Sequence, residues 1–414
     1  MRVSVERWGR ARRLPPDLRR NLSIDIASGA GVGLCMALVG VLVPVVARRG
    51  GLDALGLAVL ATGPFVANVL ALFAGRLGAR SPRSLAAVRT LSGLALVLML
   101  PFAGPVALAG LVLLFWITVA LAAPYQMRLW GVIYPTSARG RFIGLVGTGR
   151  SAAAAAGSLI GGVLADRIGG LEVVALGGVV GMILGSLAAG YLAPRTDEGP
   201  AYDRRRSWHA LTFSPRMVRI TVAQMFLGAG FIGAAPLYAF VQVDKLHLSL
   251  SEVGFLGILT AGATTLAYLP YGGLADRRGG LRVFQIGSVA GATALFLYAW
   301  SPSYLVLGVA AVLTGFNNGA VEIGTQAVIG QYAPPDERAA AFAGWSAANG
   351  VRGIFAPFVA TTLLAAGVVD VSGGILLGAL TSSVGALLYA FAGRAPATRA
   401  PSGAAVAEPP DISP

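Results

Sequence analysis

The chain contains about twelve apolar stretches of roughly 20 residues, and each is long enough to cross a bilayer as an α-helix. They are predicted at residues 23–47, 54–75, 85–104, 106–127, 142–165, 172–193, 219–243, 253–273, 282–300, 304–330, 342–366 and 372–392. In lipid a helix satisfies all of its backbone hydrogen bonds internally. We therefore predict an all-α membrane protein with twelve transmembrane helices.

The composition agrees with lipid as the solvent. Hydrophobic residues make up 56% of the chain and charged residues 12%, whereas an average soluble domain has about 25% charged residues. The formal net charge of +14 would indicate nucleic acid for a soluble protein. Here the arginines lie between the apolar stretches, so we expect a lipid bilayer as partner and no nucleic acid.

The residues that support metal or enzyme chemistry are scarce. Cys35 is the only cysteine, and His209 and His247 lie far apart. No cluster with metal-ligand spacing and no phosphate-binding loop motif is present. We expect no cofactor, no metal and no enzymatic activity. The first apolar stretch exceeds the core of about 7–15 residues of a signal peptide, which predicts a retained helix.

The longest polar gap runs from Pro194 to Arg216 and contains three consecutive arginines, Arg204, Arg205 and Arg206. It divides the chain into two groups of six helices. We predict a basic cytoplasmic segment at 1–22, a six-helix bundle at 23–193, a cytoplasmic linker at 194–218, a second six-helix bundle at 219–392 and a disordered tail at 393–414.

The two halves share a register. Gly75 and Gly272 are 197 positions apart (272 − 75), and Gly56 and Gly254 are 198 positions apart (254 − 56). Pro135–Arg139 and Pro334–Arg338 both repeat at 199 positions (334 − 135, 338 − 139). With six helices in each half, this offset predicts a parallel repeat, in which a pseudo-two-fold axis relates the two bundles.

The distribution of arginine predicts the orientation. If both termini are cytoplasmic, the outer loops hold few cations, whereas the inner segments hold many arginines. The outer cations are Arg48, Arg49, Arg167 and Lys245. The positive-inside rule then predicts a multi-pass protein of the inner (plasma) membrane with both termini in the cytoplasm.

A glycine- and arginine-rich loop follows the second helix of the second half, at Gly272–Arg282 (GGLADRRGGLR). A decayed copy stands at Gly75–Ser84 in the first half. A third segment, Gly161–Gly170 (GGVLADRIGG), has a similar sequence but falls on the outer side in the predicted topology. It is either a coincidence or a relic of a finer repeat.

The chain resembles the major facilitator superfamily over about residues 22–392. The features that carry the resemblance are the twelve helices, the 6+6 repeat, the basic central linker and this loop. The loop motif of that family is Gly-x-x-x-Asp-Arg/Lys-x-Gly-Arg/Lys. The matching positions are Gly272, Asp276, Arg277 and Gly279 and, in the first half, Gly75 and Arg80. Ala79 and Pro82 depart from the motif in the first half.

The subfamily is not assigned. Drug/proton antiporters of this superfamily carry an arginine within the fourth helix, but residues 108–123 contain none. Their fifth helix carries a glycine–proline pattern, and Ser158 stands where that pattern has proline.

The resemblance implies transport by alternating access, with Asp276 as part of a conformational latch; the alternative is a topology signal with helix capping. It also implies that the first, fourth, seventh and tenth helices line a central cavity. The polar and aromatic residues on them are Trp116, Tyr125, Gln126, Gln224, Tyr238, Asn317, Asn318 and Gln326. Each of these can instead serve as interhelical contact only.

Several charged residues lie within the predicted helices, and Asp25, Arg150, Glu322 and Arg352 are the candidates for a charged site. Glu322 is about 12 Å from the inner end of the tenth helix, and Arg352 has a similar depth in the eleventh. We expect them to pair, or to face a water-filled cavity. Glu322 is then either a proton or substrate site or half of a structural ion pair. Arg150 has either Asp25 or an anionic group of the substrate as its partner.

The sequence thus predicts a secondary active transporter that moves a small organic solute, is coupled to protons and acts as a monomer. Export is favoured over uptake, because the cavity candidates are both polar and aromatic. The alternatives are an uptake symporter of a sugar or organic anion, and a membrane scaffold or receptor that has lost transport. Substrate, direction and coupling ion are not determined by the sequence.

Overall fold

The computed structural model describes residues 14–74, 82–102, 104–135, 139–193, 215–333 and 338–392. Within these ranges all regular structure is helical. The predicted tail, most of the predicted linker, and the first-loop residues Gly75, Ala79 and Arg80 lie outside the described residues.

The first half forms six long helical segments. α2 (Pro16–Ala37), η2 (Leu38–Leu42) and α3 (Val43–Arg49) make one continuous helix with a π-helical turn in its middle. The next four are α4 (Ala54–Ala74), α5 (Pro82–Val97), α6 (Pro105–Ile133) and α7 (Arg139–Ile168). α8 (Gly170–Glu172), η3 (Val173–Gly177) and α9 (Gly178–Gly190) complete the half.

The second half has the same organisation. It begins with α11 (Pro215–Phe240) and η4 (Val241–Lys245), followed by α12 (Leu250–Arg278), α13 (Gly280–Trp300), α14 (Tyr304–Tyr332), α15 (Arg338–Ala365) and α16 (Val371–Ala392). The prediction of twelve helical segments is confirmed for the described residues. Eight helices are apolar and long enough to be candidate membrane spans.

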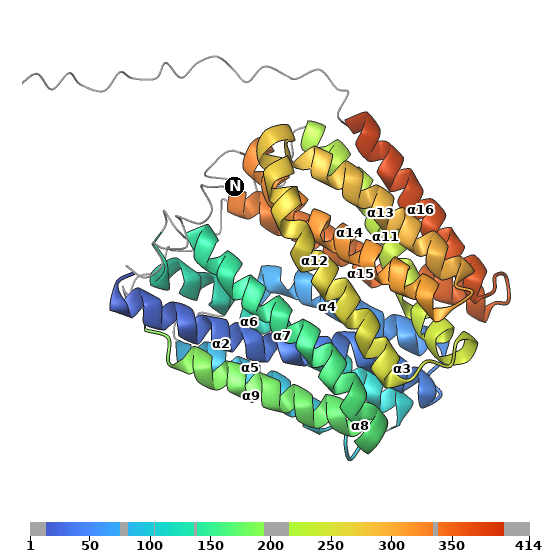
Figure 1. Ribbon diagram of the computed structural model, residues 1–414, viewed down its shortest axis with the longest axis horizontal. Coiled ribbons are helices and arrows are strands. Elements are labelled where there is room, and N and C mark those ends of the chain that lie inside the picture. Colours follow the sequence, from blue (N-terminus) through green and yellow to red (C-terminus); the bar gives the residue numbers. More distant parts are fainter. Residues whose placement is uncertain are drawn as a thin grey trace, which may run out of the picture.

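The helices of each half pack mainly against one another, and two long seams join the halves, α7 against α12 and α4 against α15. We call the end at which α2 begins and α16 ends the terminus side, and the opposite end the far side. In Figure 1 the two halves come together at the far side, near α3 and α8, and diverge toward the terminus side.

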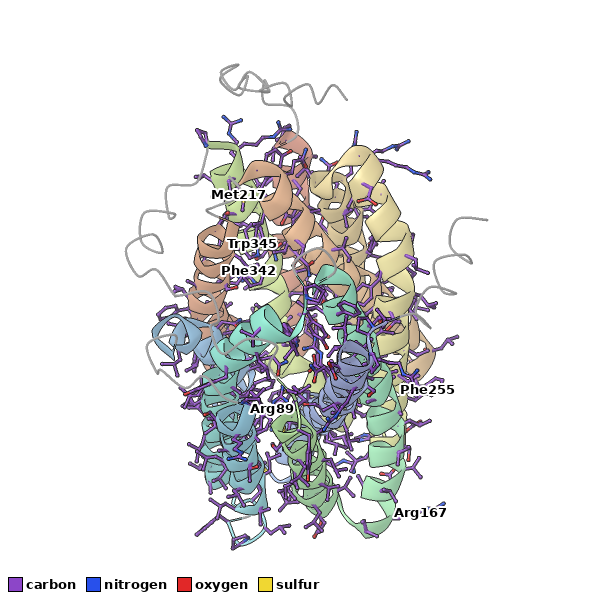
Figure 2. All side chains as sticks on the ribbon, turned by 90° about the vertical axis from the view of Figure 1, so that its left-hand side faces the viewer. Arg89, Arg167, Met217, Phe255, Phe342 and Trp345 are labelled. Carbon is purple, nitrogen blue, oxygen red and sulfur yellow. The ribbon has the colours of Figure 1, made fainter. Side chains whose placement is uncertain are left out.

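The buried apolar residues repeat this asymmetry. At the far side one cluster continues across both halves and includes Leu42 and Val43 of the first half with Leu237, Leu250 and Leu256 of the second. At the terminus side each half has its own cluster. The residues of these two clusters include Leu18, Leu85 and Phe142 in the first half and Met217, Phe284 and Trp345 in the second. Figure 2 shows Met217 and Trp345 in the second half.

Glycines permit the close approach of the helices at both seams. A Cβ atom at Gly254 of α12 would lie 2.2 Å from the backbone oxygen of Ser158 in α7. A Cβ atom at Gly353 of α15 would lie 2.0 Å from the Phe65 ring of α4. Small residues at such crossings bring two backbones into direct contact, so these positions define where the halves touch.

The outer surface of the bundle is apolar. On α16, Leu380, Leu387 and Phe391 are each more than half exposed, and their spacing of seven and four residues places them on one helix face. A face of this kind would be unfavourable in water, and it is suited to contact with lipid tails.

Candidate functional site

A cavity of about 690 Å³ lies between the two halves. Its walls come from α2–α3, α4, α6 and α7 of the first half and from α11, η4, α12, α13 and α14 of the second. Most of the wall is apolar, with aromatic residues such as Phe65, Trp116 and Phe231. Two charged residues of opposite sign, Arg150 and Glu322, also line it.

Glu322 of α14 and Arg150 of α7 lie on opposite halves and are both exposed. The Tyr268 hydroxyl of α12 donates a hydrogen bond of 2.6 Å to Glu322 Oε2. Ser151, next to Arg150, is a further hydrogen-bond partner of the Tyr268 side chain. Tyr268 therefore connects the acid of one half with the arginine-bearing helix of the other.

The structure does not bring Glu322 and Arg352 together as an ion pair. The Arg352 guanidinium donates to the backbone oxygen of Gln224 in α11 and lies directly against Gly228. Arg352 therefore faces α11. Of the two expectations for Glu322, the structure has the cavity-facing arrangement.

Asp25 and Arg150 are also not paired. Asp25 is 1% exposed and accepts hydrogen bonds from Trp130 Nε1 (2.8 Å) and the Tyr134 hydroxyl (2.9 Å), with a longer contact of 3.4 Å from Gln126 Nε2. All of these donors belong to α6 or its C-cap residue. Asp25 points into the first bundle, whereas Arg150 points into the cavity between the bundles.

Arg89 of α5 completes this network, and it was not among the predicted residues. Its guanidinium donates to Gln126 Oε1 and to the Ser28 hydroxyl, both at 2.6 Å. Ser28 in turn donates to the backbone oxygen of Gly185 at 2.8 Å. Figure 2 shows Arg89 within the first half. The arginine inside the apolar stretch 85–104 was the available signal, since a buried cation in a membrane helix requires partners.

The predicted cavity residues divide into two groups. Trp116, Tyr238 and Asn318 line the cavity. The residues that do not line it are Tyr125, Gln126, Gln224, Asn317 and Gln326. Gln126 is bound in the Arg89 network, and Gln224 accepts a 2.6 Å hydrogen bond from the Tyr389 hydroxyl. Adjacent residues such as Asn317 and Asn318 point about 100° apart on a helix, so only one of the two reaches the cavity.

The loop of the second half lies at the terminus side. Asp276 and Arg277 are exposed, and Asp276 makes no hydrogen bond or ion pair within the described residues. Gly279 ends α12 with a φ of 79°, a conformation that glycine adopts without strain, while Gly272 has open space around it. The loop is thus formed, but its acid has no partner here.

Hydrogen bonds and an ion pair join the halves at the far side. The Asp166 carboxylate at the end of α7 accepts from the backbone N–H groups of Leu250 and Ser251, both at 2.8 Å, and from the Ser251 hydroxyl at 2.5 Å. Arg48 of α3 pairs with Asp244 of η4 at 2.8 Å. These contacts hold the halves together at the far side, whereas the halves diverge toward the terminus side (Figure 1).

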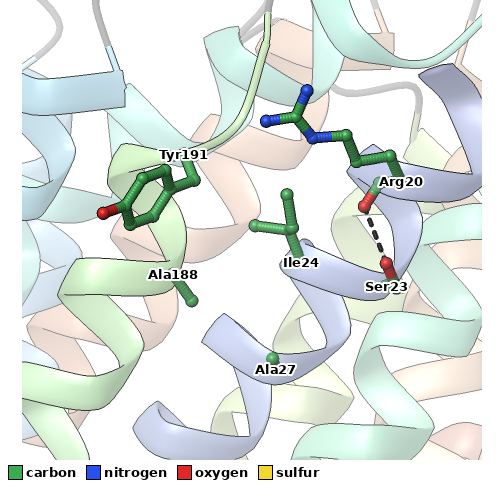
Figure 3. A pocket seen from close by; sticks show the side chains of 6 residues that line it. All are labelled: Arg20, Ser23, Ile24, Ala27, Ala188 and Tyr191. Carbon is green, nitrogen blue, oxygen red and sulfur yellow. Dashed lines mark hydrogen bonds between the residues drawn. The ribbon is translucent and has the colours of Figure 1, made fainter.

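A second hollow of about 370 Å³ lies between the terminus-side ends of α2 and α9 (Figure 3). Its wall consists of Arg20, Ser23, Ile24, Ala27, Ala188 and Tyr191. Arg20 and Tyr191 are exposed, and the Ser23 hydroxyl is bonded to the Arg20 backbone oxygen at 2.9 Å. This groove has one cation and no acid, so the central cavity is the candidate site.

Comparisons with known proteins agree with this geometry. Residues 220–413 match the family model of the Major Facilitator Superfamily. A point-mutant form of the nucleoside transporter NupG has a similar structure, with a TM-score of 0.74, 16% identity, and coverage of 90% of this chain and 99% of that chain. Comparison with curated proteins by sequence gives no match.

Two further solved structures share the fold. The human organic anion transporter MFSD10 (TETRAN) gives a TM-score of 0.65 at 14% identity, covering 91% of this chain and 100% of that chain. A bacterial homolog of the human lysosomal transporter Spinster, in an inward-facing conformation, gives 0.62 at 16% identity, covering 91% and 96%. At these identities the likeness is one of fold, and the predicted resemblance to the superfamily is confirmed.

Proposed function

We propose that this chain, a membrane transporter of the major facilitator type, is a secondary active transporter that moves a small organic solute by alternating access. The two halves would rock about the central cavity, so that it opens to one side of the membrane at a time. The observation that carries the proposal is this cavity, which is closed at the far side by contacts between the halves and contains charged groups from both.

We propose Glu322 as the proton-binding group. It faces the cavity, and its carboxylate accepts a hydrogen bond from Tyr268, a residue on a different helix. When the halves rock, the contact of Tyr268 with Ser151 of the other half would break. The hydration of Glu322 would then differ between the two states, and a proton affinity that depends on the state is the requirement for coupling.

The test is transport by the purified full chain in liposomes, with and without a pH gradient, across a panel of nucleosides, organic anions, sugars and drugs. Glu322→Gln should abolish accumulation driven by the pH gradient and retain substrate exchange. Asp17→Asn, which changes an exposed acid outside the cavity, is the matched control. If the Glu322→Gln protein still accumulates substrate with normal pH dependence, Glu322 is not the coupling site.

Two alternatives make different predictions. An uptake symporter of a sugar or organic anion would accumulate substrate in the opposite direction relative to the imposed proton gradient. A scaffold or receptor of the same fold would show no substrate-dependent change in the accessibility of cavity residues from the two sides. Export remains our preferred direction, because the aromatic wall of the cavity suits amphipathic solutes.

We also propose that the terminus side is cytoplasmic, from the excess of arginine in the loops on that side. A single cysteine near Arg205, introduced with Cys35 replaced by serine, should react only with reagents on the cytoplasmic side. Labelling from the outside alone would reverse the orientation.

A further inference from the structure

We propose that the transported solute carries one compact anionic group, a carboxylate or a phosphate, and that this group binds Arg150. This inference rests on the proposed transport function and adds the chemical class of the substrate. It is carried by the contrast between Arg150 and the other arginines located within the helices.

Two arginines located inside the bundles already have partners. Arg89 is bound to Gln126 and Ser28 inside the first bundle, and Arg352 is bound to Gln224 inside the second. The Arg150 guanidinium is exposed in the cavity and makes no hydrogen bond or ion pair with any residue that the structure describes. Both nearby acids are held elsewhere, since Asp25 faces α6 and Glu322 is bonded to Tyr268.

Arg150 is the twelfth residue of α7, about 16 Å along the helix axis. A cation at such depth is costly unless water or an anion reaches it. Its planar guanidinium forms paired hydrogen bonds with a carboxylate or phosphate. Glu322 across the cavity would repel a second anionic group, which limits the solute to one such group at this position.

The rest of the wall indicates what the anionic group is attached to. Phe65, Trp116 and Phe231 provide aromatic surface in the same cavity as Arg150, and Asn318 provides an amide. A cavity that combines an apolar wall with one free cation suits an aryl or other amphipathic organic anion.

The test is binding of matched probes to the purified full chain, measured by isothermal titration calorimetry. The probes are 1-naphthoate and phenyl phosphate, each compared with an uncharged analogue of similar shape, 1-naphthamide and phenylmethanesulfonamide. The parent should bind the anions, and Arg150→Gln should weaken that binding about 10- to 100-fold, as expected for loss of a charged hydrogen-bond partner. Arg150→Lys should retain part of the affinity.

Arg167→Gln, at the exposed far-side end of the same helix, is the control and should bind like the parent. Equal binding of anions and uncharged analogues, no binding of any probe, or unchanged binding by Arg150→Gln would each overturn the inference. Anion binding that depends on Arg150 in a protein that moves no solute in liposomes would instead refute the proposed transport function.

A different observation carries a second inference. We infer that Asp166 is a latch that holds the far side closed. Its carboxylate accepts three hydrogen bonds from the first residues of α12, and α12 belongs to the other half. The same helix start also has a capping box of its own, formed by Ser249 and Glu252. The contact to Asp166 is therefore an addition to a helix end that is already capped.

Such a latch stabilises only the state in which the far side is closed, because the donors and the acceptor move with different halves. Glycines at the adjoining seam permit the contact, since a Cβ at Gly162 would lie 2.4 Å from the Leu250 backbone oxygen. The segment 161–170 was interpreted from sequence as a coincidence or a relic of a finer repeat. In the structure its Asp166 contacts the first residues of α12.

The test is the reactivity of a single cysteine at position 242, a cavity residue of η4, with an impermeant thiol reagent applied to the far side of oriented proteoliposomes. Asp166→Ala, in a Cys35→Ser background, should increase the labelling rate about 10- to 100-fold. Ser251→Ala, which removes only one of the three donors, should give a smaller increase, and the double variant should add little to Asp166→Ala.

Asp370→Ala is the matched control. Asp370 caps α16 at the same side through the Gly373 N–H at 2.7 Å, but both residues belong to the second half. It should leave the labelling rate unchanged. Equal labelling in parent and Asp166→Ala, or an equal increase in Asp370→Ala, would refute the latch.

Discussion

Two loops of this protein share one sequence pattern and differ in what they contact. In the proposed orientation, with the terminus side cytoplasmic, the outer loop runs from Gly162 to Gly170 and the inner loop from Gly272 to Gly280. In both, an Asp-Arg pair is followed two residues later by Gly-Gly. In both, the first glycine of that pair ends the helix with a positive φ, 113° in the outer loop and 79° in the inner loop. The two turns are therefore built in the same way.

The aspartates of the two loops differ in their hydrogen-bond partners. Asp166 is bonded to the first residues of α12, whereas Asp276 is exposed and has no partner among the described residues. The halves meet at the far side and diverge at the terminus side (Figure 1). The comparison teaches that this loop pattern supplies a potential helix cap, and that the distance between the halves determines whether the cap is used.

The largest effect is expected from a side chain that keeps the halves apart at the far side. In Gly254→Val the new Cβ would lie 2.2 Å from the Ser158 backbone oxygen, which no rotamer relieves. We expect loss of most transport activity and a cavity cysteine that is labelled from the far side. Gly262→Val, on the same helix with open space around it, is the control. Normal transport by Gly254→Val would show that the seam does not need close contact.

The second prediction concerns the inner loop. If Asp276 caps a helix when the terminus side closes, Asp276→Asn should reduce the population of that state about 10-fold and slow exchange between states. Folding should be unaffected, because Asp276 has no partner in the present state. Single-molecule distance measurements between the halves would report both populations. Unchanged populations and transport rate would leave Asp276 as a topology signal only.

The third prediction separates the latch from another far-side contact, the Arg48–Asp244 ion pair. The Arg48–Asp244 pair is partly exposed, with side chains 24% and 42% accessible, and exposed pairs contribute about 0–1 kcal/mol. Asp244→Asn should therefore increase far-side labelling less than about fivefold, and the increase should disappear at high salt. An effect as large as that of Asp166→Ala would mean that the far side is held mainly by this ion pair.

The fold was predictable because the sequence patterns that specify it extend over many residues. Twelve apolar stretches and four coincident offsets are properties of many residues, and the membrane permits few alternatives to helices. The predicted positions of the helix ends were less accurate. α6 was predicted to end at 127 and continues to Ile133, and α2 was predicted to start at 23 and begins at Pro16. Helices extend past the apolar core into the interface, where polar residues no longer mark their boundary.

The site was only partly predictable, because the depth of a residue along a helix is visible in sequence and its direction is not. Glu322 and Arg352 have similar depths but face different helices, and the same holds for Asp25 and Arg150. Arg89 was visible as a charge within an apolar stretch and was overlooked. The role inferred for Asp166 depends on α12, a helix from the other half, which no local pattern reveals.

The smallest effect is expected in the first loop, where the motif lacks its acid at Ala79. Restoring the acid alone, Ala79→Asp, should change transport and the two populations by less than about twofold. The reason is the position three residues later. In both complete loops that position is a glycine with positive φ, but here it is Pro82, the first residue of α5. A proline ring fixes φ near −65°, so it cannot adopt that turn.

Ala79→Asp combined with Pro82→Gly should therefore favour closure of the terminus side more than either change alone. An effect of Ala79→Asp as large as that of Asp276→Asn would show that the acid acts through its charge and does not need the turn.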